Sequence, residues 1–232
     1  MTVVEMHVMF RELAQQMGMQ TVRAILSEDI DTCLNIAVND YIKKVIADNV
    51  KMSGNNKIYI DNAKIGQINV LRTLIDKLEI SNITINKEEN KFTAEINNNN
   101  VFLFTSSYIY YNDIFGGFSA RIVDNDYLYS TLHDFCNRAT FDYPIIVFTD
   151  NSDSKTNTII IDIYTEDNSK DINTHKKPSK VVLNIIKKPN IITYINDTSS
   201  SNINCDLPEY THIDIVKAAA ELYLRSVVST SN

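Results

Sequence analysis

Histidines and cysteines are the residues of this sequence with the clearest capacity for metal binding or catalysis. The chain has four histidines and three cysteines, and the densest group is His133, Asp134 and Cys136. On a short helix, side chains at i, i+1 and i+3 do not all converge, and the histidines lack an HxxxH or HExxH spacing. Cys33, Cys136 and Cys205 also lack the CxxC spacing of metal sites and redox centres. We therefore expect no metal site and no disulfide.

A second polar group lies near the C-terminus, where His212 is close to Glu209 and Asp214. A catalytic role there would need a nucleophile, but no GxSxG elbow is present. Our interpretation is that His212 completes the hydrogen bonding of a helix start, with Thr211 and Asp214 as a capping-box-like pair. The one glycine pair, Gly116-Gly117, is not followed by the Lys-Ser/Thr of a phosphate loop. We expect a protein that is not an enzyme and needs no cofactor.

Charge is unevenly distributed along the chain. The formal net charge is −7, and residues 100–170 hold 4 basic and 10 acidic residues, whereas 171–205 hold 5 basic and 2 acidic ones. An acidic chain is poorly suited to non-specific DNA binding, which depends on Lys and Arg. The two charged blocks are either solvated strand faces or complementary surfaces of neighbouring copies. The second reading gives four candidate subunit-interface residues: Lys176, Lys180, Lys187 and Lys188.

Helical periodicity is clear at both ends of the chain. Apolar residues recur at i, i+3 and i+4 over 2–17, over 27–46, and from Ile215 to Leu224. Ala219 and Ala220 lie on the apolar stripe of the last segment, and short side chains let another helix approach closely. We expect these three helices to pack together through Phe10, Leu34, Val38, Val216, Ala219, Ala220 and Tyr223.

The middle of the chain is rich in Val, Ile, Tyr and Phe, in runs bounded by Asn, Asp, Gly and Ser, which favours strands. We also expect a helix over 66–80, with Ile68, Leu71, Ile75 and Leu78 on one face, and a short helix over 124–135. Leu128, Leu132 and Phe135 should point inward from the short helix, and a strand is expected at Lys57–Ile60.

These segments together predict an α+β fold in which a helical bundle, formed by the N-terminal helices and the C-terminal helix, carries a β-rich central insertion. The predicted domains are 1–50 with 206–232 for the bundle, and 51–205 for the insertion with one or two short helices. No apolar run reaches the roughly 20 residues that span a bilayer, and residues 1–30 lack the pattern of a signal peptide. We expect no membrane association and synthesis inside the cell.

Several of these segments resemble one family of virus proteins. They are MTVVEMHVMFRELA (1–14), SEDIDTCLNIAVNDYIKKVI (27–46), and KKPNIITY (187–194) followed by CDLPEYTHIDIVKAAAELYL (205–224). Together with SSYIYYN (106–112), they resemble the head-to-tail adaptor, or ring, proteins of short-tailed phages, especially crAss-like phages. The resemblance covers about 60 residues at the N-terminus and about 50 at the C-terminus, and rests on packing patterns. The Asn-rich stretch 81–100 departs from it.

The resemblance implies a structural protein of the virion, made in the host bacterial cytoplasm and located at the head–tail interface. Its partners would be further copies in a ring of about twelve, the portal protein and other tail or ring proteins. DNA would pass through the channel without specific binding. An acidic wall would suit such a conduit because it repels phosphate, although the acids also serve solubility. The alternative is a phage accessory protein that binds a host protein or mimics DNA.

Overall fold

The computed structural model describes the chain in two compact units, apart from short gaps. Unit 1 comprises Met1–Leu74 and Lys188–Asn232, and unit 2 comprises Ile75–Lys187. The sequence had placed the divisions at 50/51 and 205/206 instead. The described residues are 1–17, 25–48, 51–53, 57–59, 68–97, 100–150, 158–166, 171–198 and 200–229.

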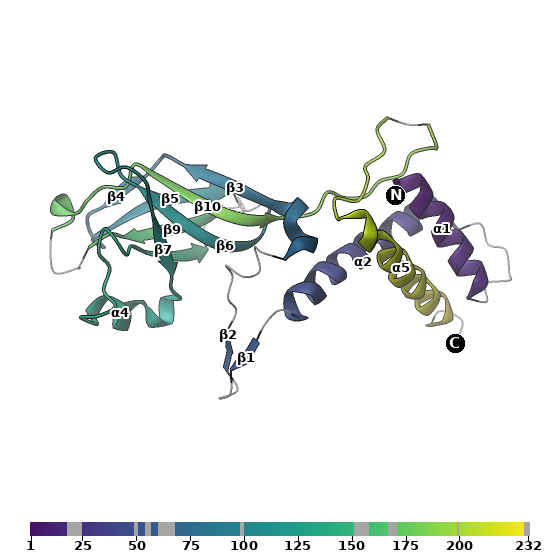
Figure 1. The fold of residues 1–232 in the computed structure, drawn as a ribbon, viewed down its shortest axis with the longest axis horizontal. Helices are drawn as coiled ribbons and strands as arrows, with labels where there is room; N and C mark the ends of the chain where they lie inside the picture. Colours follow the sequence, from purple (N-terminus) through teal and green to yellow (C-terminus); the bar gives the residue numbers. More distant parts are fainter. Residues whose placement is uncertain are drawn as a thin grey trace. The chain divides into compact units, whose positions relative to one another are not determined.

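The fold class predicted from the sequence, a helical bundle carrying a β-rich insertion, is wrong. The dominant element of the fold is a curled, mixed sheet of eight strands that forms a half-barrel with its own core (Figure 1). In the described ranges the α-helices number four, namely α1 (Val3–Gln16), α2 (Ser27–Asp48), α4 (Asn125–His133) and α5 (Glu209–Ser229). Composition identified strand-forming runs, but not that they would join in one sheet with its own core.

The sheet of unit 2 is antiparallel except at one pair of strands. Its order is β3-β10-β6-β7-β8-β9-β5-β4, and only β7 and β8 run parallel. In that order the bounds are Ile75–Ile80, Lys180–Lys187, Val101–Tyr110, Gly117–Ile122, Ile145–Asp150, Thr158–Tyr164, Lys91–Asn97 and Thr84–Asn86.

Strand β7 joins the two halves of the sheet through different parts of its length. It pairs with Ser107–Tyr110 of β6, and then with β8 only at Arg121 and Ile122. Beyond this junction the rings of Phe104 on β6 and Phe148 on β8 stack with centroids 4.3 Å apart. The curl encloses a core drawn from most strands: Phe92, Ile96, Ile109, Ile146, Ile161, Ile163, Val181, Leu183 and Ile185.

Helix α4 covers a second, smaller apolar cluster. Leu132 is buried there with Ile145, Val147 and Tyr164, whose side chains alternate with those of the main core along β8 and β9. The inward position predicted for Phe135 is wrong, because this ring is 81% exposed. Helix α4 ends at His133, so Phe135 no longer follows the buried helical face.

Unit 1 contains α1, α2 and α5. Helix α1 begins with a capping box, in which Thr2 Oγ1 accepts from the Glu5 amide (3.3 Å) and the Glu5 carboxylate accepts from the Thr2 amide (2.9 Å). Helix α5 packs along both α1 and α2, which touch each other less. No helix in the described part of the chain is long and apolar enough to cross a membrane.

The region between α2 and the sheet differs from its predicted structure. The helix expected over 66–80 is wrong: the chain forms a 3-10 helix, η1 (Asn69–Leu74), and then β3. Pairing along the whole of β3 with β10 overrides the local helical spacing. Two short strands, β1 (Lys51–Ser53) and β2 (Lys57–Tyr59), pair antiparallel. Ile60, the end of the strand predicted there, lies outside the described residues, and η2 spans Ile172–Thr174.

Candidate functional site

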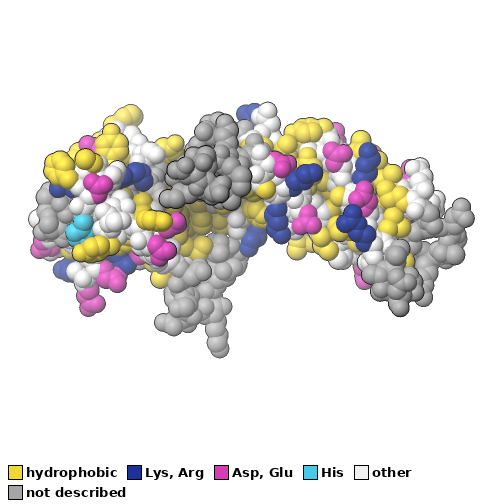
Figure 2. All heavy atoms as spheres, turned by 90° about the horizontal axis from the view of Figure 1, so that it is seen from below, with side chains coloured by type: hydrophobic (Ala, Val, Ile, Leu, Met, Phe, Trp, Pro, Cys, Tyr) yellow, Lys and Arg dark blue, Asp and Glu magenta, His cyan; other side chains and the backbone are white. Residues whose placement is uncertain are grey.

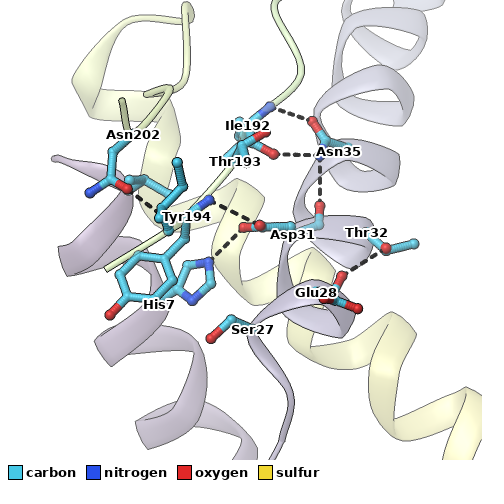
Figure 3. Close-up of polar contacts among 12 residues, drawn as sticks. His7, Ser27, Glu28, Asp31, Thr32, Asn35, Ile192, Thr193, Tyr194 and Asn202 are labelled. Carbon is cyan, nitrogen blue, oxygen red and sulfur yellow. Dashed lines mark hydrogen bonds and ion pairs between the residues drawn. The ribbon is translucent and has the colours of Figure 1, made fainter. Parts of the chain in front are cut away.

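The most elaborate group of polar contacts in unit 1 joins α1 and α2 to an extended segment that precedes α5. We call this segment, residues 190–206 apart from 199, the strap, and we call the polar contacts around it the interlock. His7, Asp31, Asn35 and Tyr194 converge there from three parts of the chain (Figure 3).

Two side chains of α2 hold the strap by its backbone. Asn35 donates from Nδ2 to the Ile192 carbonyl (2.9 Å) and accepts from the Ile192 amide at Oδ1 (2.8 Å). One turn earlier, Asp31 accepts from the Tyr194 amide at Oδ2 (3.0 Å). Positions i and i+4 share a helix face, and alternate residues of an extended chain share an edge, so α2 binds the strap as a neighbouring strand would.

His7 connects α1 to the same carboxylate. Its Nε2 lies 2.7 Å from Asp31 Oδ1, and its ring stacks on Tyr194 with centroids 4.5 Å apart. The side chain is 1% exposed, and Nδ1 is buried without a hydrogen-bond partner. Burial lowers the pKa of His7, an effect that outweighs the opposing attraction of Asp31 and is reinforced by the nearby Arg11 charge. The neutral ring therefore donates to Asp31 from Nε2.

The strap is also closed on itself by short polar side chains. Thr193 and Ile203 form an antiparallel bridge, and Asn202 Oδ1 accepts from the Ile195 amide (2.8 Å). Asn204 Oδ1 accepts from the Val3 amide at the start of α1 (2.8 Å). These bonds satisfy backbone groups that have no ladder of their own, which keeps an irregular segment in one conformation.

A His–Asp pair can serve as a base with its orienting group in catalysis. Here the 1% exposure of the His7 side chain prevents a substrate from reaching it. A second largely buried ion pair, Lys91 and Asp162 in unit 2, is joined at 2.8 Å, and Thr93 Oγ1 lies 3.5 Å from the carboxylate. Burial has the largest single effect on the pKa of Lys91 and lowers it, but the hydrogen bonds to Asp162 and Glu89 and the charge of Asp162 together raise this pKa above its ordinary value. Both pairs are arranged as structural ties.

The residues chosen for helix packing lie in the interior of unit 1 or at its margin. The rings of Phe10 and Tyr223 meet edge to face with centroids 5.9 Å apart, which joins α1 to α5. Tyr223 is partly buried, and the others are buried: Phe10, Leu34, Val38, Val216, Ala219 and Ala220.

The start of α5 differs in detail from the predicted capping pair. The helix begins at Glu209, and the Thr211 hydroxyl donates to the Pro208 carbonyl (2.7 Å), so Thr211 is not the cap residue. His212 is buried, and its Nε2 donates to the Leu207 carbonyl (2.8 Å). The histidine therefore holds the turn before the helix, whereas the sequence suggested that it would satisfy amides of the first turn.

The four interface lysines do not form one cluster. Lys176 pairs with Asp113 (3.7 Å) and lies over the rings of Tyr111 and Phe141. Lys180 pairs with Glu79 (3.0 Å) and lies over the Tyr110 ring.

Lys187 ends β10, and the exposed Lys188 begins the second segment of unit 1. Lys176 and Lys180, by contrast, are already engaged by carboxylates of their own subunit.

The group His133, Asp134 and Cys136 is a helix end followed by a turn. His133 Nδ1 donates to the Tyr129 carbonyl (2.8 Å), and Asp134 accepts from the Asn137 side chain (2.5 Å) and the Cys136 amide (2.9 Å). These bonds hold the pKa of Asp134 below its ordinary value. In the described ranges, no three His, Cys, Asp or Glu side chains are grouped as a metal site, and all three cysteines are unpaired.

The sequence alone assigned no role to His7, Asp31 or Asn35. The signal of Asp31 and Asn35 is weak but present, since the two polar residues follow Ile30 and Leu34, which are themselves buried one turn apart. Such a polar pair lies beside the apolar stripe of many surface helices, so the spacing alone does not distinguish a solvated face from one that binds the strap.

Comparison with known proteins adds no relative to this description. No model of a protein family matches the chain, and no curated protein is similar to it in sequence.

Proposed function

We propose that this chain is a structural protein of a short-tailed phage virion, in which copies form a ring between the portal and the tail. The ring holds about twelve copies and has portal, tail and further ring proteins as its neighbours. DNA passes through it without specific binding, and no cofactor takes part. The site of action is the head–tail interface of the virion, after synthesis in the host cytoplasm.

The observation that carries this proposal is where the resembling segments lie in the structure. Segments 1–14, 27–46, 187–194 and 205–224, which are far apart in the sequence, become α1, α2, the beginning of the strap and α5. Apart from Lys187 they belong to unit 1. Four residues of the interlock, namely His7, Asp31, Asn35 and Tyr194, come from these same segments. Four of the five resembling segments thus lie in one packed unit, whereas the fifth, 106–112, belongs to unit 2. This concentration supports a shared architecture better than scattered matches would.

The charge of the chain is compatible with a conduit for DNA. With a net charge of −7, a ring of many copies would repel phosphate at its inner wall and let the duplex slide. Neighbouring copies would meet head to tail, because a heterologous contact closes into a ring under rotation. Lys187 and Lys188, at the end of the basic block, are the residues that we assign to this contact.

Immunogold labelling of virions tests the proposed location. Particles of the phage that encodes this chain would be labelled with an antibody raised against the purified protein. We expect gold at one vertex per particle, between head and tail. Labelling over the capsid faces, or no label on particles whose tails are opened by mild denaturation, would contradict the proposal.

A further inference from the structure

Exposed aromatic side chains gather on unit 2 around α4 and the loop that follows it. Tyr127, Tyr129, Phe135 and Tyr143 are each between 65% and 81% exposed. We call residues 124–143, with Arg121 and Glu166, the α4 surface. Figure 2 looks at the side on which α4 lies and shows apolar side chains among charged ones of both signs there. Large exposed rings in one region are typical of a binding surface.

The α4 surface contains two adjoining hollows. One is about 450 Å³ and the other about 360 Å³, and they share Arg138, Thr140 and Tyr143. Asp142 and Glu166 also line the larger hollow, and Phe135 lines the smaller. Each hollow is large enough for the end of a long side chain, and Tyr143 stands between them.

The charge of the α4 surface is negative. It contains five carboxylates (Asp124, Asp126, Asp134, Asp142 and Glu166) and two guanidinium groups. One of these, Arg121, donates from Nη2 to the carbonyls of Asn137 (2.6 Å) and Arg138 (3.3 Å), and so stabilises the loop that follows α4. The rim of the surface therefore favours a cationic ligand and repels a phosphate.

The chain itself shows how this region accommodates cations. Lys176 lies 5.8 Å from the Tyr111 ring centroid and 5.6 Å from that of Phe141, with Asp113 as its ion-pair partner. Arg138 lies 5.2 Å from the Phe135 ring centroid. A cation over an aromatic face thus recurs in this part of unit 2, and at Lys176 a carboxylate accompanies it.

We propose that the α4 surface binds a lysine- or arginine-rich segment of a partner protein. A cationic side chain lies against Tyr143 and reaches Asp142 in the larger hollow, while Tyr127 and Tyr129 contact further residues of the same segment. The net negative charge of the surface disfavours nucleic acid as the ligand, and a purely apolar segment would offer no counter-charge to Asp142 in the larger hollow. This inference does not depend on the proposed ring, because it concerns a surface of unit 2 in any copy.

Binding of a fluorescein-labelled dodecapeptide of alternating arginine and glycine, followed by fluorescence anisotropy at about 150 mM salt, tests the proposal. Tyr143→Ala leaves the net charge unchanged, and we expect it to weaken binding about threefold or more. Tyr210→Ala is the matched control, because Tyr210 is a similarly exposed tyrosine on α5 of unit 1. It should leave the affinity unchanged.

A second pair of variants separates specific recognition from general attraction to an acidic protein. Asp142→Asn should weaken peptide binding at least about threefold more than Asp76→Asn, which removes one exposed carboxylate from β3. Circular dichroism of each variant establishes that folding is retained.

Four outcomes would overturn the proposal. They are no peptide binding by the parent protein, equal losses in the variants and their controls, Tyr143-dependent binding of a DNA duplex, and a change in self-association on sedimentation of Tyr143→Ala. The last would identify a second copy as the occupant.

Discussion

Removing the Asn35 side chain should loosen the strap without disturbing the helices. Asn35→Ala deletes both hydrogen bonds to Ile192, at 2.8 and 2.9 Å, and leaves that partly buried backbone without its partners. Each such bond has a net value of about 1 kcal/mol, so the strap should lose about 2 kcal/mol of local stability. Alanine also favours the helix, and thus α2 itself should persist.

Amide hydrogen exchange measures this loss directly. A change of about 2 kcal/mol corresponds to roughly thirtyfold faster exchange. The Tyr194 amide, which is bound by Asp31 and not by Asn35, is the reporter, because it is released only when the strap itself opens.

Asn39→Ala is the matched control for this substitution. Asn39 lies one turn further along α2, and its side chain donates only to the Asn35 carbonyl within the helix (2.9 Å). In the Asn39→Ala variant we expect the Tyr194 amide to exchange hydrogen at the same rate as in the parent protein. Equal protection of Tyr194 in the two variants would refute the idea that the interlock holds the strap.

Two further predictions concern the interior of unit 1. Ala219→Leu should lower the free energy of unfolding in urea by about 1–3 kcal/mol through overpacking. Ala218→Leu, at an exposed position of α5, should change it by less than about 0.5 kcal/mol. Equal effects of the two substitutions would show that α5 does not pack as described. Because burial lowers the pKa of His7 below its unfolded value of 6.5, the unfolded chain binds the extra proton first, so the free energy of unfolding should fall as pH drops below about 6.5 and level off below the folded pKa. His7→Gln should remove this part of the pH dependence and His133→Gln, at an exposed histidine, should keep it; a pH profile unchanged in His7→Gln would contradict the assigned role.

Local patterns in the sequence were sufficient for the helices of unit 1. The 3.6-residue spacing of apolar side chains predicted helices over 2–17 and 27–46, and the structure has them at Val3–Gln16 and Ser27–Asp48. These signals act within one or two turns and so survive in any tertiary context.

The sheet could not be predicted in the same way, because strand pairing joins distant residues. The stretch that reads as a helix over 66–80 becomes β3 from Ile75 onward, since β10, more than 100 residues later, offers a full edge. Likewise, nothing near β7 in the sequence indicates that it divides its length between β6 and β8. The half-barrel follows from these pairings and not from composition.

The interlock was missed for the same reason. Asn35 and Ile192 are 157 positions apart, and Asp31 and Tyr194 are 163 apart. A single sequence records the polar side chains but not the backbone groups that they satisfy. The aromatic α4 surface was missed because the exposure of each side chain was inferred from its position on a continuous helix. Helix α4 ends at His133, so this inference does not hold for the exposed Phe135.

Native mass spectrometry of the purified chain, with and without the portal protein of the same phage, tests the central proposal most directly. Surface ion pairs contribute only about 0–1 kcal/mol each, so we expect mostly monomer alone and rings once the portal raises the local concentration. Changing Lys187 and Lys188 together to Glu should leave the monomer folded but impair ring formation on the portal. Stable rings without the portal, no rings on the portal, or normal rings from the double variant would contradict the proposed assembly.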